Sequence, residues 1–128
     1  MSVRGVRGAI DASEDRPEEI LRATRELLTA ILEANPTLRS EDIASAIFTS
    51  TDDLKSAYPA RAAREMGWNS VPMICSQEIP VPGGLPCCIR VLLHWNTDLD
   101  QGSVQHVYLG KAAGLRPDLT GKKDHKLC

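Results

Sequence analysis

Aromatic side chains and long apolar runs are both scarce in this chain of 128 residues. Aromatic residues make up 4% of the sequence, and the longest stretch without Asp, Glu, Lys or Arg is the twelve residues Met66–Gln77. A membrane-spanning helix needs about 20 mostly apolar residues, so we expect no membrane partner. The first residues also lack the apolar core of a signal peptide. We therefore expect a soluble cytoplasmic protein.

A basic excess is missing as well. The chain carries 15 Lys and Arg residues against 17 Asp and Glu residues, a formal net charge of -2. Nucleic-acid-binding proteins normally have a clear positive excess, so we expect no nucleic-acid partner. Ten of the 15 basic residues are nevertheless Arg, the side chain that binds carboxylates and phosphates through two parallel hydrogen bonds. This bias is a hint of an anionic ligand and no more.

The sequence contains no recognisable metal-binding or nucleophile motif. The four cysteines include no C-x-x-C pair, and no histidine completes a zinc-ligand spacing, so we expect neither a metal nor a disulfide framework. The G-x-S-x-G elbow, the P-loop and the G-x-G-x-x-G fingerprint are also absent. An enzyme built from this chain would use cationic donors, a carboxylate and neutral polar groups. Those groups suit a reaction governed by electrostatics and positioning.

Apolar periodicity predicts strands interspersed with helices. A long helix is expected from Pro17 to Asn35 with Asp15 as its N-cap, and a shorter helix over Pro59–Met66 that ends at Gly67. The expected strands are Val3–Ile10, Ile43–Thr51, Val71–Glu78, Cys87–Thr97 and Gln105–Lys111. This order predicts an α+β fold, in which a mixed β-sheet packs against one long helix and one shorter helix. We expect a single domain over residues 1–119 and a flexible tail over residues 120–128.

Such a sheet leaves one of its faces without a helical cover. With few aromatic side chains and one long helix, the chain can cover only one face of the sheet well. Closed homo-oligomers are the commonest way to bury a remaining face, so we expect self-association.

A cation interrupts the most apolar of the predicted strands. Strand alternation puts Arg90 on the face that also carries Leu92 and His94, where a buried cation needs an anionic partner. Glu78, at the end of the preceding apolar strand, is one candidate for that partner. A bound anionic ligand is the other, and both interpretations stay open at this point.

Four blocks of the sequence together resemble the Bacillus-type (AroH-type) monofunctional chorismate mutases. They are RGVRGA at 4–9, YPARAARE at 58–65, CSQE at 75–78 with CIRV at 88–91, and HVYL at 106–109 with LRPDL at 115–119. The blocks occur in the family's order and spacing over roughly residues 3 to 119. Each block is weak evidence alone, whereas the set is specific.

The resemblance implies a fold, an assembly and a reaction. The assembly is a homotrimer whose sheets form a pseudo α/β barrel, with active sites at the subunit interfaces. The reaction is the intramolecular (3,3-sigmatropic) Claisen rearrangement of chorismate to prephenate, in phenylalanine and tyrosine biosynthesis. This reaction needs no cofactor, metal or covalent intermediate. Chorismate is a dicarboxylate, which is consistent with a site rich in Arg.

The resemblance also implies roles for individual residues. Arg90 matches the donor to the ether oxygen of chorismate, and Glu78 matches the carboxylate that receives the ring hydroxyl. Arg7 and Tyr108 match residues that hold a substrate carboxylate, and Cys75 matches a position beside the ring hydroxyl. The expected lining of the cleft, part of it from a neighbouring subunit, consists of Tyr58, Ala60, Arg61, Arg64, Met73, Ile74, Leu115 and Arg116.

One geometric question and two alternative functions remain open. In an ideal strand Cys75 and Glu78 face opposite ways, so both reach one ligand only if the strand has a bulge or ends there. The first alternative is a Rid-type imine or enamine deaminase, a family with a similar fold and interfacial clefts. The second is a non-catalytic trimer that binds a small acid of the aromatic pathway.

Overall fold

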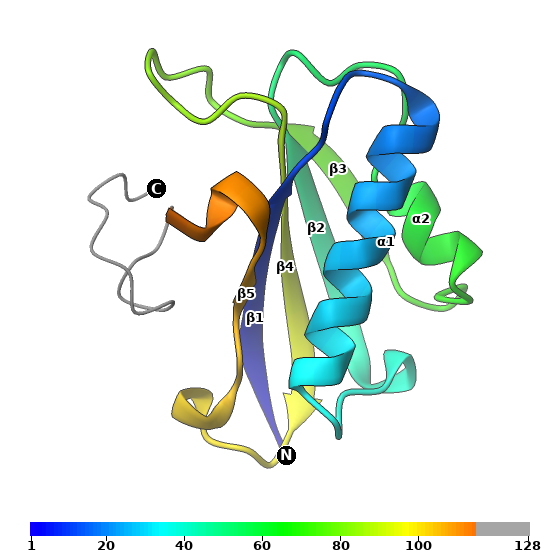
Figure 1. Cartoon of the computed structure of the whole chain (residues 1–128). Helices are drawn as coiled ribbons and strands as arrows, with labels where there is room; N and C mark the ends of the chain where they lie inside the picture. The colour runs from blue at the N-terminus through cyan, green and yellow to red at the C-terminus, as the bar shows by residue number, and fades with distance from the viewer. Residues whose placement is uncertain (115–128) are drawn as a thin grey trace.

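The computed structural model describes residues 1–114, in which a five-stranded sheet carries two α-helices on the same face (Figure 1). The strands are β1 (Ser2–Asp11), β2 (Ile43–Ser50), β3 (Met73–Gln77), β4 (Cys88–Thr97) and β5 (Val107–Tyr108). The helices are α1 (Pro17–Ala34) and α2 (Ala60–Glu65), and short 3-10 turns cover Ser40–Asp42, Gln101–Ser103 and Gly110–Gly114. The predicted α+β class, with one long and one shorter helix, is confirmed.

The sheet is mixed, as predicted, with the order β3-β2-β4-β1-β5. The central strand β4 runs antiparallel to both of its neighbours, while the outer pairs β2–β3 and β1–β5 are parallel. Strands β1 and β4 pair along ten residues each, from Ser2 opposite Thr97 to Asp11 opposite Cys88. Helix α2 lies in the crossover between the parallel strands β2 and β3, a connection that antiparallel strands do not need.

The hydrophobic core lies between the sheet and α1. Its largest fully buried side chains include Trp95 and Phe48 from the sheet and Leu27 from the helix. The predicted alternation of β4 is confirmed, because the side chains that face the helices are all buried; they are Ile89, Val91, Leu93 and Trp95. Helix α2 is shorter than the predicted Pro59–Met66, with Met66 as its C-cap, and Gly67 follows at a φ of 95°, which suits a residue without a Cβ.

No α-helix of residues 1–114 covers the opposite face of the sheet, and we call this the open face (Figure 1). The 3-10 segment Gly110–Gly114 packs over one part of it, where Ala112 contacts the cluster of Ala9 and Cys88. The strand register sets a row of side chains across it, from Ile74 through Ile47 and Leu92 to Arg7. The Ile74 side chain on the edge strand is 63% exposed. This face is therefore the candidate surface for the self-association that the sequence led us to expect.

The start of α1 differs from the prediction. Its N-cap is Arg16 rather than Asp15, and no side chain caps it. The Asp15 carboxylate instead accepts hydrogen bonds from Lys55 N at 2.9 Å, Ser56 N at 3.0 Å and Ser56 Oγ at 2.8 Å. These hydrogen bonds, led by that of the Ser56 hydroxyl, lower the pKa of Asp15. Asp15, which the local sequence pattern predicts as the N-cap, thus binds the distant loop at Lys55 and Ser56 instead.

The last predicted strand, Gln105–Lys111, is shortened to β5 because side chains replace backbone partners along the edge of β1. The Gln101 amide pairs with both Gly5 N and Gly5 O, at 2.9 and 2.7 Å. The Nδ1 atom of His106 accepts a hydrogen bond from Arg7 N at 3.0 Å. The backbone groups at the edge of β1 are therefore hydrogen-bonded over a longer segment than the two residues of β5 cover.

Three further predicted strands, Ile43–Thr51, Val71–Glu78 and Cys87–Thr97, extend one or two residues beyond the observed β2, β3 and β4. The strand predicted over Val71–Glu78 is β3, so Glu78 lies just beyond its end. The strand predicted from Cys87 begins at Cys88, because Cys87 has a φ of 53° that breaks the extended backbone.

Some expectations lie outside the described residues. These are the site residues Leu115 and Arg116, the domain end at residue 119 and the tail at 120–128. Within residues 1–114, no helix combines the length and the apolar character that crossing a membrane requires.

Candidate active site

An ion pair joins the end of β3 to the start of β4. Arg90 Nε lies 3.5 Å from Glu78 Oε1, and the two side chains are only 16% and 23% exposed. The Oγ1 atom of Thr49 donates a hydrogen bond to the same carboxylate oxygen at 2.7 Å. The sheet brings the three together, because Thr49 lies opposite Arg90 and the Glu78 N–H donates to Ser50 O at 2.9 Å. Of the two partners considered for Arg90, the internal carboxylate is therefore confirmed.

A cavity of about 1020 Å³ adjoins this ion pair on the open face. Its lining combines the cations Arg7 and Arg90 with Glu78, the loop of residues 79–86 and residues 51–53. The lining thus holds the carboxylates Asp52, Asp53 and Glu78, and it is the part with Arg7 and Arg90 beside Glu78 that suits an anionic ligand carrying a hydroxyl group.

Tyr108 lies on the other side of β1 from Arg90. Ala9 separates them in the sheet, paired with Arg90 on β4 and with Tyr108 on β5. The Tyr108 side chain is buried in a small cluster with Ala9, Cys88 and Ala112. The register thus brings Arg7, Arg90 and Tyr108 to the same face, as the resemblance implies, although Tyr108 does not line the cavity.

A polar clip fixes the base of the loop over residues 79–86. The Asp53 carboxylate accepts hydrogen bonds from Thr51 Oγ1 at 2.5 Å and from Cys87 N at 3.0 Å. Partial burial alone would raise the pKa of Asp53, but these hydrogen bonds outweigh it and the pKa is lowered. Burial, and then the Asp53 charge, raise the pKa of the Cys87 thiol. The clip holds the positive-φ backbone at Cys87 that turns the loop into β4.

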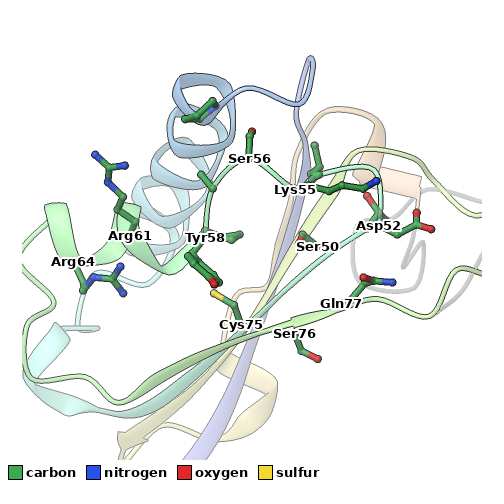
Figure 2. A pocket seen from close by; sticks show the side chains of 15 residues that line it. Ser50, Asp52, Lys55, Ser56, Tyr58, Arg61, Arg64, Cys75, Ser76 and Gln77 are labelled. Carbon is green, nitrogen blue, oxygen red and sulfur yellow. The ribbon is translucent and has the colours of Figure 1, made fainter.

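A second cavity, of about 610 Å³, lies at α2 (Figure 2). Its lining includes Tyr58, Arg61, Arg64 and Cys75, four of the predicted site residues. In Figure 2 the Cys75 side chain points toward Tyr58, and Arg61 and Arg64 both come from α2. Arg61 Nε lies 3.2 Å from Glu65 Oε2, and Tyr58 is 72% exposed. This cavity therefore combines cationic side chains, among them Lys55, with the exposed ring of Tyr58.

The predicted site residues fall into two groups within one protomer. Cys75 pairs with buried Phe48 and so faces the helices, whereas Glu78 binds Arg90 beside the open face. The two side chains do lie on opposite sides of the sheet, and Glu78 lies just past the end of β3 rather than at a bulge. The remaining predicted positions line neither cavity: Ala60 is buried, Met73 half-buried and Ile74 exposed.

Two residues of the site were missed from the sequence. Thr49 binds Glu78, and Asp53 holds the loop beside it. To find Thr49 or Asp53, one must know which residues of neighbouring strands lie opposite each other. The hydrophobic pattern of a single strand does not contain this register. Within residues 1–114, no group of three or more His, Cys, Asp or Glu side chains is arranged to hold a metal ion.

Comparison with known proteins identifies the family. The family model for chorismate mutase type I matches residues 3–119. The chain belongs to the type I chorismate mutase family. Among curated members, chorismate mutase AroH of Thermus thermophilus is 57% identical over 117 residues, which is 91% of this chain and 96% of that protein. Chorismate mutase AroH of Bacillus subtilis is 45% identical over 128 residues, or 99% of this chain and 100% of that protein.

The type I chorismate mutase fold is also found in a solved relative. A chorismate mutase from Clostridium thermocellum superposes with a TM-score of 0.82 at 48% sequence identity. The match covers 84% of this chain and 96% of that chain. The identity is high enough for the likeness to concern the family and not the fold alone.

Proposed function

We propose that this chain is a chorismate mutase, which converts chorismate to prephenate by an intramolecular rearrangement. The observation that carries the proposal is the Arg90–Glu78 pair beside a cavity that also contains Arg7, in a chain of the type I chorismate mutase family. Chorismate is a dianion with a ring hydroxyl, so its recognition calls for cations together with a hydrogen-bond acceptor.

The reaction makes modest chemical demands on the protein. One C–O bond of the substrate breaks while one C–C bond forms within the same molecule, and no proton, electron or group is exchanged with the enzyme. The enolpyruvyl side chain must be held over the ring, so positioning contributes directly to the rate. The cavity contains groups suited to that task, and none of them has to act as an acid, a base or a nucleophile.

Arg90 and Glu78 are assigned complementary roles. As the C–O bond breaks, negative charge grows on the ether oxygen, and a guanidinium donor held in advance stabilises that charge. Arg90 is our candidate for this donor, because its side chain is largely withdrawn from water. Glu78 would receive the ring hydroxyl and face the positive charge that develops on the ring. Arg7 and Tyr108 would hold a carboxylate of the substrate.

We further propose that each site forms between two protomers of a homotrimer. Glu78 and Cys75 line two different cavities, one beside the open face and one at α2, so no single cavity of one protomer is lined by both. A neighbouring copy could bring its Tyr58, Arg61 and Arg64 to the cavity that contains Arg90. The uncovered open face, with its exposed Ile74, supplies apolar surface for such an assembly.

The two alternative functions have less support from the family match and the site. A Rid-type deaminase is disfavoured by the family match over residues 3–119. A non-catalytic trimer that binds an aromatic-pathway acid would need the cations but not the half-buried Arg90–Glu78 pair. A cytoplasmic location, like the trimer, stays a prediction from the sequence.

The test is the disappearance of chorismate in the presence of the purified protein, followed by its absorbance. We expect strong acceleration over the buffer rate, with prephenate as the product. The absence of acceleration by a folded protein would contradict the proposed function. Native mass measurement should give three copies, and a monomer with full activity would contradict the interfacial site.

A further inference from the structure

We propose that Thr49 is a positioning residue that aims the carboxylate of Glu78 at the substrate. This inference rests on the function proposed above and adds a residue to its machinery. Thr49 does not line the cavity, so it would act through Glu78 and not by touching the ligand.

The contacts around Glu78 are divided unequally between its two oxygens. Thr49 Oγ1 donates to Oε1 at 2.7 Å, and Arg90 Nε lies 3.5 Å from the same atom. A length of 2.7 Å is typical of a strong hydrogen bond from a hydroxyl to an oxygen acceptor. Both of these contacts fall on Oε1 rather than on Oε2. The arrangement holds one oxygen and leaves the other to accept the ring hydroxyl of the substrate.

Glu78 needs such support because its backbone gives little. It lies one residue past the end of β3, where its backbone N–H still donates to Ser50 O. The next residue, Ile79, is already 80% exposed. The Glu side chain has three rotatable bonds, and holding it in one conformation costs entropy. A catalytic group left to sample several conformations spends less time in the productive one.

Thr49 is well suited to provide that support. It lies on β2 between Ser76 on β3 and Arg90 on β4, so its backbone is held on both sides. Its β-branched side chain has few rotamers, which fixes the direction of the hydroxyl. Oγ1 therefore presents its hydrogen to Glu78 from a rigid frame.

Arg90 alone cannot hold Glu78 throughout the reaction. Its guanidinium is assigned to the ether oxygen of the substrate, and its 3.5 Å contact with Glu78 is long for a hydrogen bond. When the ligand draws Arg90 toward itself, the shorter bond from Thr49 keeps the carboxylate oriented. Thr49 thus allows the two charged groups to act on the ligand independently.

The experiment compares hydroxyl-deleting and hydroxyl-keeping variants. Thr49→Val keeps the β-branched shape and removes the donor, Thr49→Ala removes the donor without adding an apolar methyl, and Thr49→Ser keeps the hydroxyl. The matched control is Thr97→Val at the other end of the sheet, where Oγ1 accepts a bond from Leu99 N at 3.2 Å. For each, kcat and KM for chorismate are measured together with the thermal midpoint.

We expect Thr49→Val and Thr49→Ala to lower kcat about tenfold or more with little change in KM, as for other hydrogen bonds to charged groups. Thr49→Ser should keep most of the activity, and Thr97→Val should turn over like the parent protein. A normal kcat in Thr49→Val or Thr49→Ala would overturn the inference, and so would a loss in Thr49→Ser as deep as in Thr49→Ala. If Thr49→Val fails to fold, Thr49→Ala decides. An inactive parent protein would instead refute the proposed function.

Discussion

Replacing Arg90 by Lys tests whether a planar guanidinium, rather than positive charge alone, is needed in the cavity. Lysine retains a cation beside Glu78, so the carboxylate 3.5 Å away keeps an opposite charge and the fold is preserved. What lysine lacks is the rigid fork of donors that can serve two acceptors at once. Removing a preorganised donor to developing charge costs ~3 kcal/mol or more. At 25 °C this corresponds to a fall in kcat of about a hundredfold.

The assay for Arg90→Lys is the initial rate of chorismate loss at saturating substrate. The matched control is Arg39→Lys, because the Arg39 side chain is 70% exposed and pairs with Glu41 on the surface at 3.2 Å. Thermal unfolding should give similar midpoints for both variants, and only Arg90→Lys should lose turnover. A kcat near that of the parent protein would mean that Arg90 serves the fold and not the reaction, and our assignment would be wrong.

Three further predictions concern packing and pH. A Cβ on Gly8 would lie 2.8 Å from Ile31 Cδ1 and 3.2 Å from Val107 O, so Gly8→Ala should cost about 1–3 kcal/mol in the free energy of unfolding, measured with urea. The pKa of Asp53 is lowered below its ordinary 3.8, so its ionised form stabilises the fold above that pH, and the stabilisation is lost as pH falls through the folded-state pKa. Asp53→Asn should accordingly destabilise the protein at pH 7, and the difference should shrink below about pH 4; a constant difference would refute the clip. Turnover should be nearly flat from about pH 6 to 8 because no general base is involved, and a bell-shaped kcat profile would contradict this.

Much of the fold was predictable because its determinants are local. The long helix follows from apolar side chains at helical spacing, and the alternating burial along β4 follows from the strand period. The errors occur where distant segments intervene. Asp15 leaves the cap position to bind Ser56, and Gln101 pairs with Gly5 in place of a longer β5. Local patterns contain no information about such contacts.

The candidate site was predictable by family resemblance more than by chemistry. The sequence alone singled out Arg90 and its possible partner Glu78, because a cation in an apolar strand is costly. It could not supply the register that sets Thr49 beside that pair. It also could not separate the residues of the two cavities, since neighbours along the chain such as Gln77 and Glu78 line different ones.

The claim that two protomers build each site is tested most directly by mixing two defective chains. One chain carries Arg90→Ala and the other carries Arg61→Ala with Arg64→Ala, so each damages a different cavity. In randomly mixed trimers assembled by co-expression, about one quarter of the interfaces would pair an intact Arg90 with intact Arg61 and Arg64. We predict activity of about one quarter of the parent value, well above the average of the two defective proteins. Activity equal to that average would contradict a shared site.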